Sequence, residues 1–281
     1  MKKKLHYAGA AVLLASVPLF MLAPGRVTKR QRAPFQNVNF AHRGLHSRDK
    51  SVPENSLEAF ELASRAGYGI ELDVQLTKDG IPVVIHDETI DRVTEKKGWV
   101  KDYTLKKLKE LTVLKNKFPE YSAAKIPTLE EVLDAVKASG IQVNIELKTG
   151  IYWYPEIEQK VADLVKKAGM EERVIYSSFN HYSIQQMKKI VPEAETAYLY
   201  SDVILNVAEY AKNTKVDGLH PAVYHVKMAD FLKEYLGSNL NVRVWTVNEK
   251  ADMKWLIDAG VTAIITNYPD MAVQIKKEAE V

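Results

Sequence analysis

The chain has 281 residues, of which 46% are hydrophobic and 27% charged, a composition that suits one globular domain with a single large core. It contains no cysteine, which excludes disulfide bridges, thiolate metal sites and a cysteine nucleophile. The net charge of +3 comes from the N-terminus, because residues 1–32 hold seven Lys or Arg and no acid. The remaining 32 basic and 36 acidic residues give no support for a nucleic-acid-binding surface.

From residue 5 to residue 25 the chain has no Asp, Glu, Lys or Arg and consists mainly of small and branched apolar residues. This length is close to what a helix needs to cross the core of a bilayer. We interpret residues 1–26 as a hydrophobic helix that anchors the protein in the cell membrane with a single pass. Residues 27–38 are then a linker, and the order of charged and apolar residues favours a folded domain outside the cytoplasm.

Two other interpretations of this segment remain. A secretory signal peptide has the same order of charged and apolar residues, and its cleavage would release a secreted protein. The only nearby sequence suited to cleavage, residues 21–23, is followed by Pro24, which usually blocks the processing step. A segment that lies only at the membrane surface is the third interpretation.

From residue 39 onward, short runs rich in Val, Ile and Tyr alternate with segments whose apolar residues recur at helical spacing. The predicted strands span 39–44, 68–74, 142–148, 173–179, 196–200, 217–221, 242–247 and 262–267. A helix is predicted after each of them. Eight such units in one domain, residues 39–281, predict a TIM (β/α)8 barrel, and a doubly wound open sheet is the weaker alternative.

Capping residues predict where two of the helices begin. Asn55 with Glu58, and Thr128 with Glu131, have the spacing of a capping box. The other six helices are predicted near 155–168, 180–190, 202–213, 225–236, 248–259 and 268–279.

The second strand is followed by another β-type run instead of a helix. Asp79-Gly80 lies between the two runs and predicts a hairpin. With these two residues as the loop, Asp73 would lie opposite His86. Residues 88–127 then form a small polar insertion, which we expect over the barrel mouth as a lid or subdomain.

Polar residues gather at the C-terminal ends of the predicted strands, where a barrel of this class carries its chemistry. They are His42, Arg43, Glu71, Asp73, His86, Glu146 and Lys148. Glu71 and Asp73 are two residues apart and therefore point to the same side of their strand. The same spacing pairs Glu146 with Lys148, so we expect all these groups on one rim of the barrel.

Three carboxylates without thiolates favour a hard divalent cation, Ca²⁺ or Mg²⁺. Arg43 and Lys148 beside that ion would complement a phosphate group. His42 and His86 could supply a general base and a general acid. This combination predicts metal-assisted hydrolysis of a phosphodiester.

Each of these residues also has a structural interpretation. A lone Glu-x-Asp is more often ion-paired on a surface, and a lone histidine is usually structural, but their shared position at one end of the strands favours a site. Trp245 is either core packing or an apolar wall for substrate, and His220 ends a strand without an obvious partner. Four other histidines lack this placement and are expected as solvent or cap residues: His6, His46, His181 and His225.

Seven segments together resemble the glycerophosphodiester phosphodiesterase family. They are AHRG at 41–44, PENSLEAF at 53–60, IELDVQLTKDGIPVVIHDETIDRVT at 70–94, IPTLEEVL at 126–133, NIELK at 144–148, SSF at 177–179 and VWTVN at 244–248. The resemblance implies a TIM barrel with an insertion after the second strand. It also implies hydrolysis of small glycerophosphodiesters to sn-glycerol 3-phosphate and an alcohol.

The resemblance further implies roles for individual residues. His42 and His86 would be the acid–base pair. The metal ligands would be Glu71, Asp73 and Glu146. The remaining roles are phosphate binding for Arg43 and Lys148, the glycerol side for Trp245, and support of the site for Glu54.

Two alternatives from other classes stay open at this point. A related lipid-directed phosphodiesterase would act on lysophospholipids or lipid head groups, and a non-catalytic binding protein could have kept the barrel. The sequence leaves the alcohol of the substrate, the assignment of acid and base, and the oligomeric state unassigned.

Overall fold

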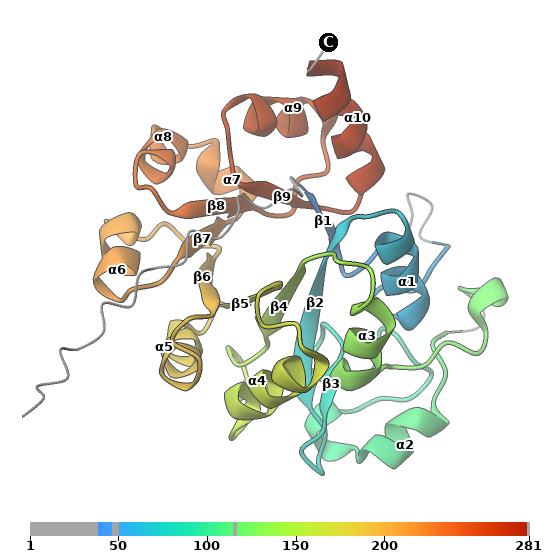
Figure 1. Cartoon of the computed structure of the whole chain (residues 1–281). Coiled ribbons are helices and arrows are strands. Elements are labelled where there is room, and N and C mark those ends of the chain that lie inside the picture. Colours follow the sequence, from blue (N-terminus) through green and yellow to red (C-terminus); the bar gives the residue numbers. More distant parts are fainter. Residues whose placement is uncertain (1–38, 47–50, 115–116, 280–281) are drawn as a thin grey trace, which may run out of the picture. The chain divides into compact units, whose positions relative to one another are not determined.

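A closed parallel β-barrel organises the computed structural model, which describes residues 39–46, 51–114 and 117–279 (Figure 1). Its eight strands are β1 (Asn39–His42), β2 (Gly69–Leu76), β4 (Val143–Leu147), β5 (Val174–Ser178), β6 (Glu195–Tyr200), β7 (Gly218–Pro221), β8 (Asn241–Val244) and β9 (Ala263–Thr266). Phe40 in β1 lies opposite both Gly69 and Ile265, and these two pairings close the barrel. The predicted TIM barrel is confirmed, and the open-sheet alternative is wrong.

The expected anchor at 1–26 and the linker at 27–38 lie outside the described residues. Among the residues that the structure describes, none of the helices combines the length and the apolar character needed to span a bilayer.

Helices follow the strands around the barrel. They are α1 (Leu57–Arg65), α3 (Leu129–Val136), α4 (Ile157–Ala168), α5 (His181–Ile190), α6 (Val207–Asn213), α7 (Val223–Val226), α8 (Phe231–Leu236), α9 (Lys250–Asp258) and α10 (Pro269–Ala279). The single helix predicted near 225–236 is wrong, because α7 and α8 are separate and Ala229 between them has a left-handed φ of 44°. A helix cannot continue through that conformation.

The two predicted helix starts differ in outcome. The capping box of Thr128 and Glu131 is present at the start of α3. In α1, however, the N-cap is Ser56, whose hydroxyl accepts a hydrogen bond from the backbone N–H of Ala59. Asn55 was the predicted cap, but its side chain is directed elsewhere, to Asp73 on β2.

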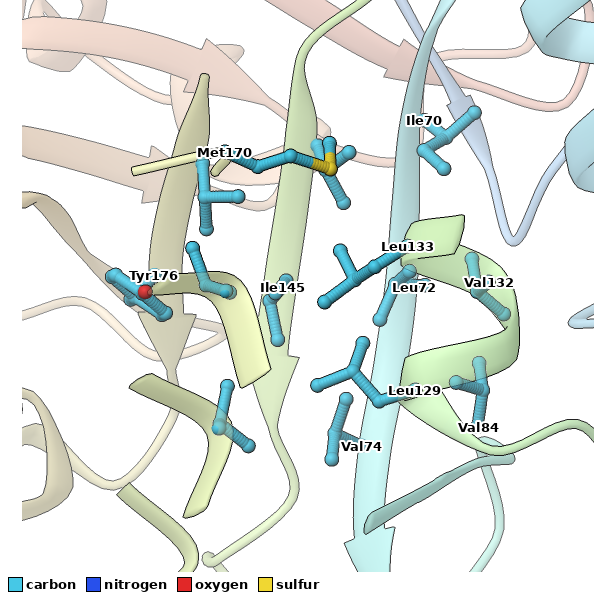
Figure 2. Packing of buried hydrophobic residues seen from close by; sticks show 14 of the residues in the cluster. Ile70, Leu72, Val74, Val84, Leu129, Val132, Leu133, Ile145, Met170 and Tyr176 are labelled. Atoms are coloured by element: carbon cyan, nitrogen blue, oxygen red, sulfur yellow. The ribbon is translucent and has the colours of Figure 1, made fainter. Parts of the chain in front are cut away.

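The two faces of strand β2 have different roles, since one packs in the hydrophobic core and the other faces the site. Ile70, Leu72 and Val74 alternate along the strand and belong to the large cluster between the barrel and its helices. Figure 2 shows Leu129 and Leu133 of α3 directed at β2 and β4 in this cluster. The residues between them on β2, including two carboxylates, therefore point to the opposite side, into the barrel.

Strand β3 (Pro82–Val84) pairs antiparallel with β2, as the hairpin signal predicts, but in a different register. The backbone N–H of Ile85, instead of His86, donates to the carbonyl of Asp73. The cause is the loop, which spans residues 78–80 and has Gly80 at a left-handed φ of 74°. A three-residue loop ending in a left-handed glycine shifts the pairing by one residue.

The insertion at 88–127 has a small hydrophobic core of its own beside β3. It contains η1 (Val100–Asp102), the short helix α2 (Leu105–Glu110) and η2 (Pro119–Tyr121). Ile90, Val100, Leu108 and Ile126 cluster with Val83 and Ile85 of the hairpin. The insertion is thus fixed to the end of β2 and β3, and Arg92 links it to the rim of the barrel.

A buried ion pair crosses the barrel interior at the opposite end from the predicted site. Arg243 donates to Glu195 at 2.6 Å, and Glu195 also accepts from Asn241 at 2.8 Å. Glu195 is the first residue of β6, and Asn241 is the first residue of β8. His220 is buried next to Arg243, and this burial together with the Arg243 charge lowers its pKa well below the usual range. We assign His220 to the structural interior, because its side chain is fully buried beside Arg243.

The packing predicts a large stability effect at Leu133. Leu133→Ala should lower the free energy of unfolding by about 2–5 kcal/mol, because the cavity lies between α3 and two strands. Leu205→Ala is the matched control: Leu205 is 86% exposed and its truncation should change stability by no more than about 0.5 kcal/mol. Chemical denaturation measures both, and equal effects would contradict this description of the core.

Candidate functional site

Three buried carboxylates of β2 and β4 meet inside the barrel, where Glu71 lies opposite His42, the last residue of β1. Glu71 and Asp73 point inward from β2, and Glu146 lies opposite Asp73 in the register of β4. One oxygen from each carboxylate lies within 4.8 Å of the others. The pairing of two adjacent strands therefore brings together groups that are more than seventy residues apart in the sequence.

Burial and mutual repulsion act together on the pKa values of these acids. Burial and the charges of Asp73 and Glu146 raise the pKa of Glu71 well above its usual value. Burial also raises the pKa of Glu146 to about 7, with Asp73 adding to the effect and Lys148 opposing it. For Asp73, burial is outweighed by the positive charges of Arg43 and Lys148, so its pKa falls to about 2. When all three acids are ionised, the cluster carries one negative charge more than Arg43 and Lys148 neutralise.

Asp73 also has an acceptor atom that no other described side chain satisfies by a hydrogen bond. Its Oδ2 accepts from Asn55 at 2.9 Å, but its Oδ1 is buried without a hydrogen-bond partner. The Nζ of Lys148 is 4.0 Å from Oδ1, too far for a hydrogen bond. A buried carboxylate oxygen of this kind fits a cation ligand.

Arg43 connects the end of β1 to two acids. Its backbone N–H donates to Glu71 at 3.0 Å, and its guanidinium donates to Glu54 at 2.8 Å. The Nε of the same guanidinium is 3.6 Å from Asp73. Arg43 reaches these partners from a left-handed backbone conformation, with φ of 57°.

The glycine after Arg43 makes this turn possible. Gly44 has φ of 84°, and a Cβ on it would lie 2.8 Å from the Cβ of Ala59 in α1. Only glycine allows the turn to pack so closely on the helix. The AHRG segment thus fixes the direction of both His42 and Arg43.

Lys148 lies just beyond β4 and faces the same carboxylates. Its Nζ is 3.1 Å from Glu146, and its side chain is mostly buried. Glu54, on the opposite side of the site, accepts from both Arg43 and Arg92 at 2.8 Å. Arg92, which comes from the insertion, was not predicted from the sequence.

His42 is held by an asparagine from the last strand–helix loop. The Nδ1 of His42 lies 2.8 Å from the Oδ1 of Asn267, and the Nε2 of His46 lies 3.2 Å from the same oxygen. The expectation that His46 is a solvent or cap residue is wrong, since it is 6% exposed and adjoins the site. Burial and the nearby charge of Arg43 lower the pKa of His42 to about 4.

The ring of His86 is paired with a carboxylate, whereas the ring of His42 is paired with the side-chain amide of Asn267. Its Nδ1 lies 2.6 Å from Asp87, which in turn accepts from the Nε of Arg92 at 2.7 Å. The side-chain amide of Gln75 lies within hydrogen-bond distance of the backbone carbonyls of residues 85, 86 and 87. Although the register differs by one residue, His86 is still close enough to contribute to the lowered pKa of Asp73.

Trp245 lies after β8 and packs on the barrel interior, while its contact with substrate stays a prediction. Its ring packs against the interior cluster that includes Phe40 and Ile265. Its Nε1 donates to the backbone carbonyl of His220 at 2.7 Å, and Phe179 meets it edge to face at 5.4 Å. The side chain is partly buried and forms an apolar boundary at this end of the barrel interior.

The other two described histidines are structural. His181 donates its Nε2–H to the carbonyl of Leu199 at 3.0 Å and stacks on Tyr198. His225 is buried in α7, so its expected position in solvent is wrong.

Comparison with known proteins decides the family. The Glycerophosphoryl diester phosphodiesterase family model matches residues 42–271. The chain belongs to this family. A glycerophosphodiester phosphodiesterase of Bacillus altitudinis is 43% identical, over 85% of this chain and 98% of that protein. One from Caldanaerobacter subterraneus is 41% identical, over 85% of this chain and 97% of that protein.

A solved phosphodiesterase structure has a similar fold. The phosphodiesterase of Oleispira antarctica, in complex with the product sn-glycerol-3-phosphate, has a TM-score of 0.72 and 26% identity. The match covers 85% of this chain and 96% of that chain.

The geometry predicts that the carboxylate cluster binds a divalent cation. After chelator treatment, Ca²⁺ or Mg²⁺ should raise the thermal unfolding midpoint, because a ligand that binds only the folded state stabilises it. Glu146→Gln should reduce this increase at the same cation concentration. Glu130→Gln, on the surface of α3, is the control and should respond as the wild type does. Equal responses of all three proteins would place the cation elsewhere.

Proposed function

We propose that this protein is a divalent-cation-dependent phosphodiesterase that cleaves glycerophosphodiesters to sn-glycerol 3-phosphate and an alcohol. The observation that carries the proposal is the buried cluster of Glu71, Asp73 and Glu146 with two cationic side chains beside it. Family membership supports the same activity, since the relatives described above carry its name.

The cluster fits a hard cation. It offers carboxylate oxygens without sulfur, and the charge in excess of Arg43 and Lys148 favours a divalent ion, Ca²⁺ or Mg²⁺. When bound, such an ion would supply a Lewis acid that polarises a phosphoryl oxygen. Arg43 and Lys148 would orient the phosphate by charge-assisted hydrogen bonds from opposite sides of the cluster.

The two histidines divide the proton transfers. We assign His42 as the general base, because its Nδ1–H can donate to the neutral Oδ1 of Asn267, which leaves the lone pair on Nε2. We assign His86 as the general acid, because the carboxylate of Asp87 stabilises its protonated ring. The lowered pKa of His42 agrees with a neutral ring.

Each histidine moves one proton while phosphorus exchanges one oxygen for another. His42 takes the proton of the attacking hydroxyl, from water or from the 2-hydroxyl of the substrate, as the new P–O bond forms. His86 gives its proton to the oxygen of the departing alcohol as the old P–O bond breaks. Attack by water gives sn-glycerol 3-phosphate directly. Attack by the 2-hydroxyl gives a five-membered cyclic phosphate, which water opens in a second step: His86 takes the proton of the water, and His42 returns its proton to the 2-oxygen as that P–O bond breaks. Trp245 would border the glycerol side, and Glu54 would hold Arg43 in position.

A coupled assay for sn-glycerol 3-phosphate tests this function. Purified protein should release it from glycerophosphocholine, lose the activity in chelator, and regain it with Ca²⁺ or Mg²⁺. Activity that persists at full rate after chelation and dialysis would contradict the cation dependence. Absence of release from any soluble glycerophosphodiester would contradict the substrate class.

The acid–base assignment makes a prediction about leaving groups. His42→Ala and His86→Ala should each lower turnover of glycerophosphocholine by about 10²- to 10⁴-fold. With a p-nitrophenyl ester, whose alcohol departs without protonation, His86→Ala should recover most of the loss and His42→Ala should not. Circular dichroism checks folding, and recovery by His42→Ala alone would reverse the assignment.

A lipid-directed phosphodiesterase is the second candidate, favoured by exposed apolar side chains on loops at the site's end of the barrel. It would hydrolyse lysophospholipids or lipid head groups with the same residues. Activity on micellar substrate that exceeds activity on glycerophosphocholine would identify it.

We also propose that residues 1–26 anchor the protein in the cell membrane, with the barrel outside the cytoplasm. Support comes from the apolar run at 5–25 between two basic flanks. The full-length protein should stay in the membrane fraction after an alkaline wash. Recovery of a soluble chain that begins at or after Pro24 would contradict the anchor and indicate a cleaved signal.

A further inference from the structure

Exposed apolar side chains are concentrated on three consecutive strand–helix loops of the barrel. We name these side chains the apolar crest: Ile151 and Trp153 after β4, Phe179 after β5 with Tyr182 in the first turn of α5, and Val203 and Leu205 after β6. Leu205 is 86% exposed, Ile151 71% and Tyr182 60%. Side chains this exposed project from the surface at the loop tips and are not the edge of a packed core.

The crest lies at the same end of the barrel as the carboxylate cluster. The strands run in parallel, so the loops after β4, β5 and β6 all leave the barrel at that end, before the neighbouring helices α4, α5 and α6 (Figure 1). Phe179 joins the crest to the site, because its ring meets Trp245 at 5.4 Å. An object that covers the crest would therefore also face the proposed site.

The chemistry of the crest suits a membrane interface. Residues 149–155 and 203–207 contain no charged side chain. Trp153 and Tyr182 pack together at 5.6 Å, and aromatic rings with a polar edge are the side chains that proteins place at the level of lipid head groups. Leucine and isoleucine tips can enter the acyl layer beneath.

A bilayer is favoured over a second copy of the chain as the occupant. A protein docked on the crest would cover the end of the barrel that carries the site, whereas a bilayer surface can present phosphodiesters to it. The twelve residues of the linker 27–38 can span about 40 Å when extended. Strand β2, with eight residues, is about 26 Å long, so the linker can run the height of the barrel.

We propose that the apolar crest docks on a phospholipid bilayer and turns the site toward the lipid head groups. The substrates that this orientation favours are glycerophosphodiesters held at the bilayer surface, a class that rests on the proposed function. The docking itself depends only on the crest.

The absence of cysteine allows a test by single-site labelling of the full-length protein. Leu205→Cys carries an environment-sensitive fluorophore, and the protein is mixed with vesicles of phosphatidylcholine and phosphatidylglycerol. The emission should shift to the blue on vesicle binding. Trp255→Cys is the control, because Trp255 is 40% exposed on α9, away from these loops, and its label should keep the emission seen in water.

Two outcomes would overturn the docking proposal. The label at position 205 would keep its aqueous emission, or both labels would shift equally and indicate a different contact surface. Hydrolysis of glycerophosphocholine by the labelled proteins is measured in parallel. Loss of docking with retained hydrolysis refutes the crest alone, whereas docking without hydrolysis refutes the proposed function.

A charge substitution links docking to activity. The double variant Ile151→Glu, Leu205→Glu should lower the rate on lysophospholipid embedded in these vesicles by about tenfold or more, since each tip loses its transfer into the acyl layer. Its rate on soluble glycerophosphocholine should stay unchanged. An unchanged rate on the vesicle substrate would contradict the proposal.

Discussion

Repulsion among three buried carboxylates is the constraint on which the rest of the site depends. The register of β2 and β4 forces Glu71, Asp73 and Glu146 into one cluster, and the helices on the outside prevent the strands from separating. Burial then raises the pKa of two of these acids, while nearby cations keep the third ionised. Such a cluster destabilises the folded protein unless a cation or a proton is bound to it. A purely structural role therefore does not explain the cluster.

The polar groups around the cluster follow from the same constraint. Each is held by a second group: Arg43 by Glu54 in the same β1–α1 loop, His42 by Asn267 after the last strand, and His86 by its neighbour Asp87. The positions of the reacting groups are thereby fixed before any ligand binds, which lowers the cost of ordering them during the reaction. The apolar crest, at the same end of the barrel, would orient this end of the protein toward a lipid bilayer.

The sequence predicts the barrel and the carboxylates because both depend on short-range periodicity. Alternation on β2 alone places Glu71 beside Asp73, and the barrel rule places them on the rim. The sequence does not predict the role of Asn267, which lies 225 residues from His42. The two residues meet only when β1 and β9 close the barrel. The hairpin register was wrong by one residue because a loop of two or three residues fits the same Asp79-Gly80 signal. Asn55 is an equally good N-cap in sequence, and only the tertiary bond to Asp73 decides otherwise.

Diffraction from crystals of the protein grown with Mn²⁺ and sn-glycerol 3-phosphate tests the central claim most directly. Anomalous scattering should place one ion between Glu71, Asp73 and Glu146, with metal–oxygen distances of about 2.0–2.6 Å. The phosphate should bind that ion and contact Arg43 and Lys148. An ion bound away from the three carboxylates, or a phosphate that contacts neither cationic side chain, would contradict the account.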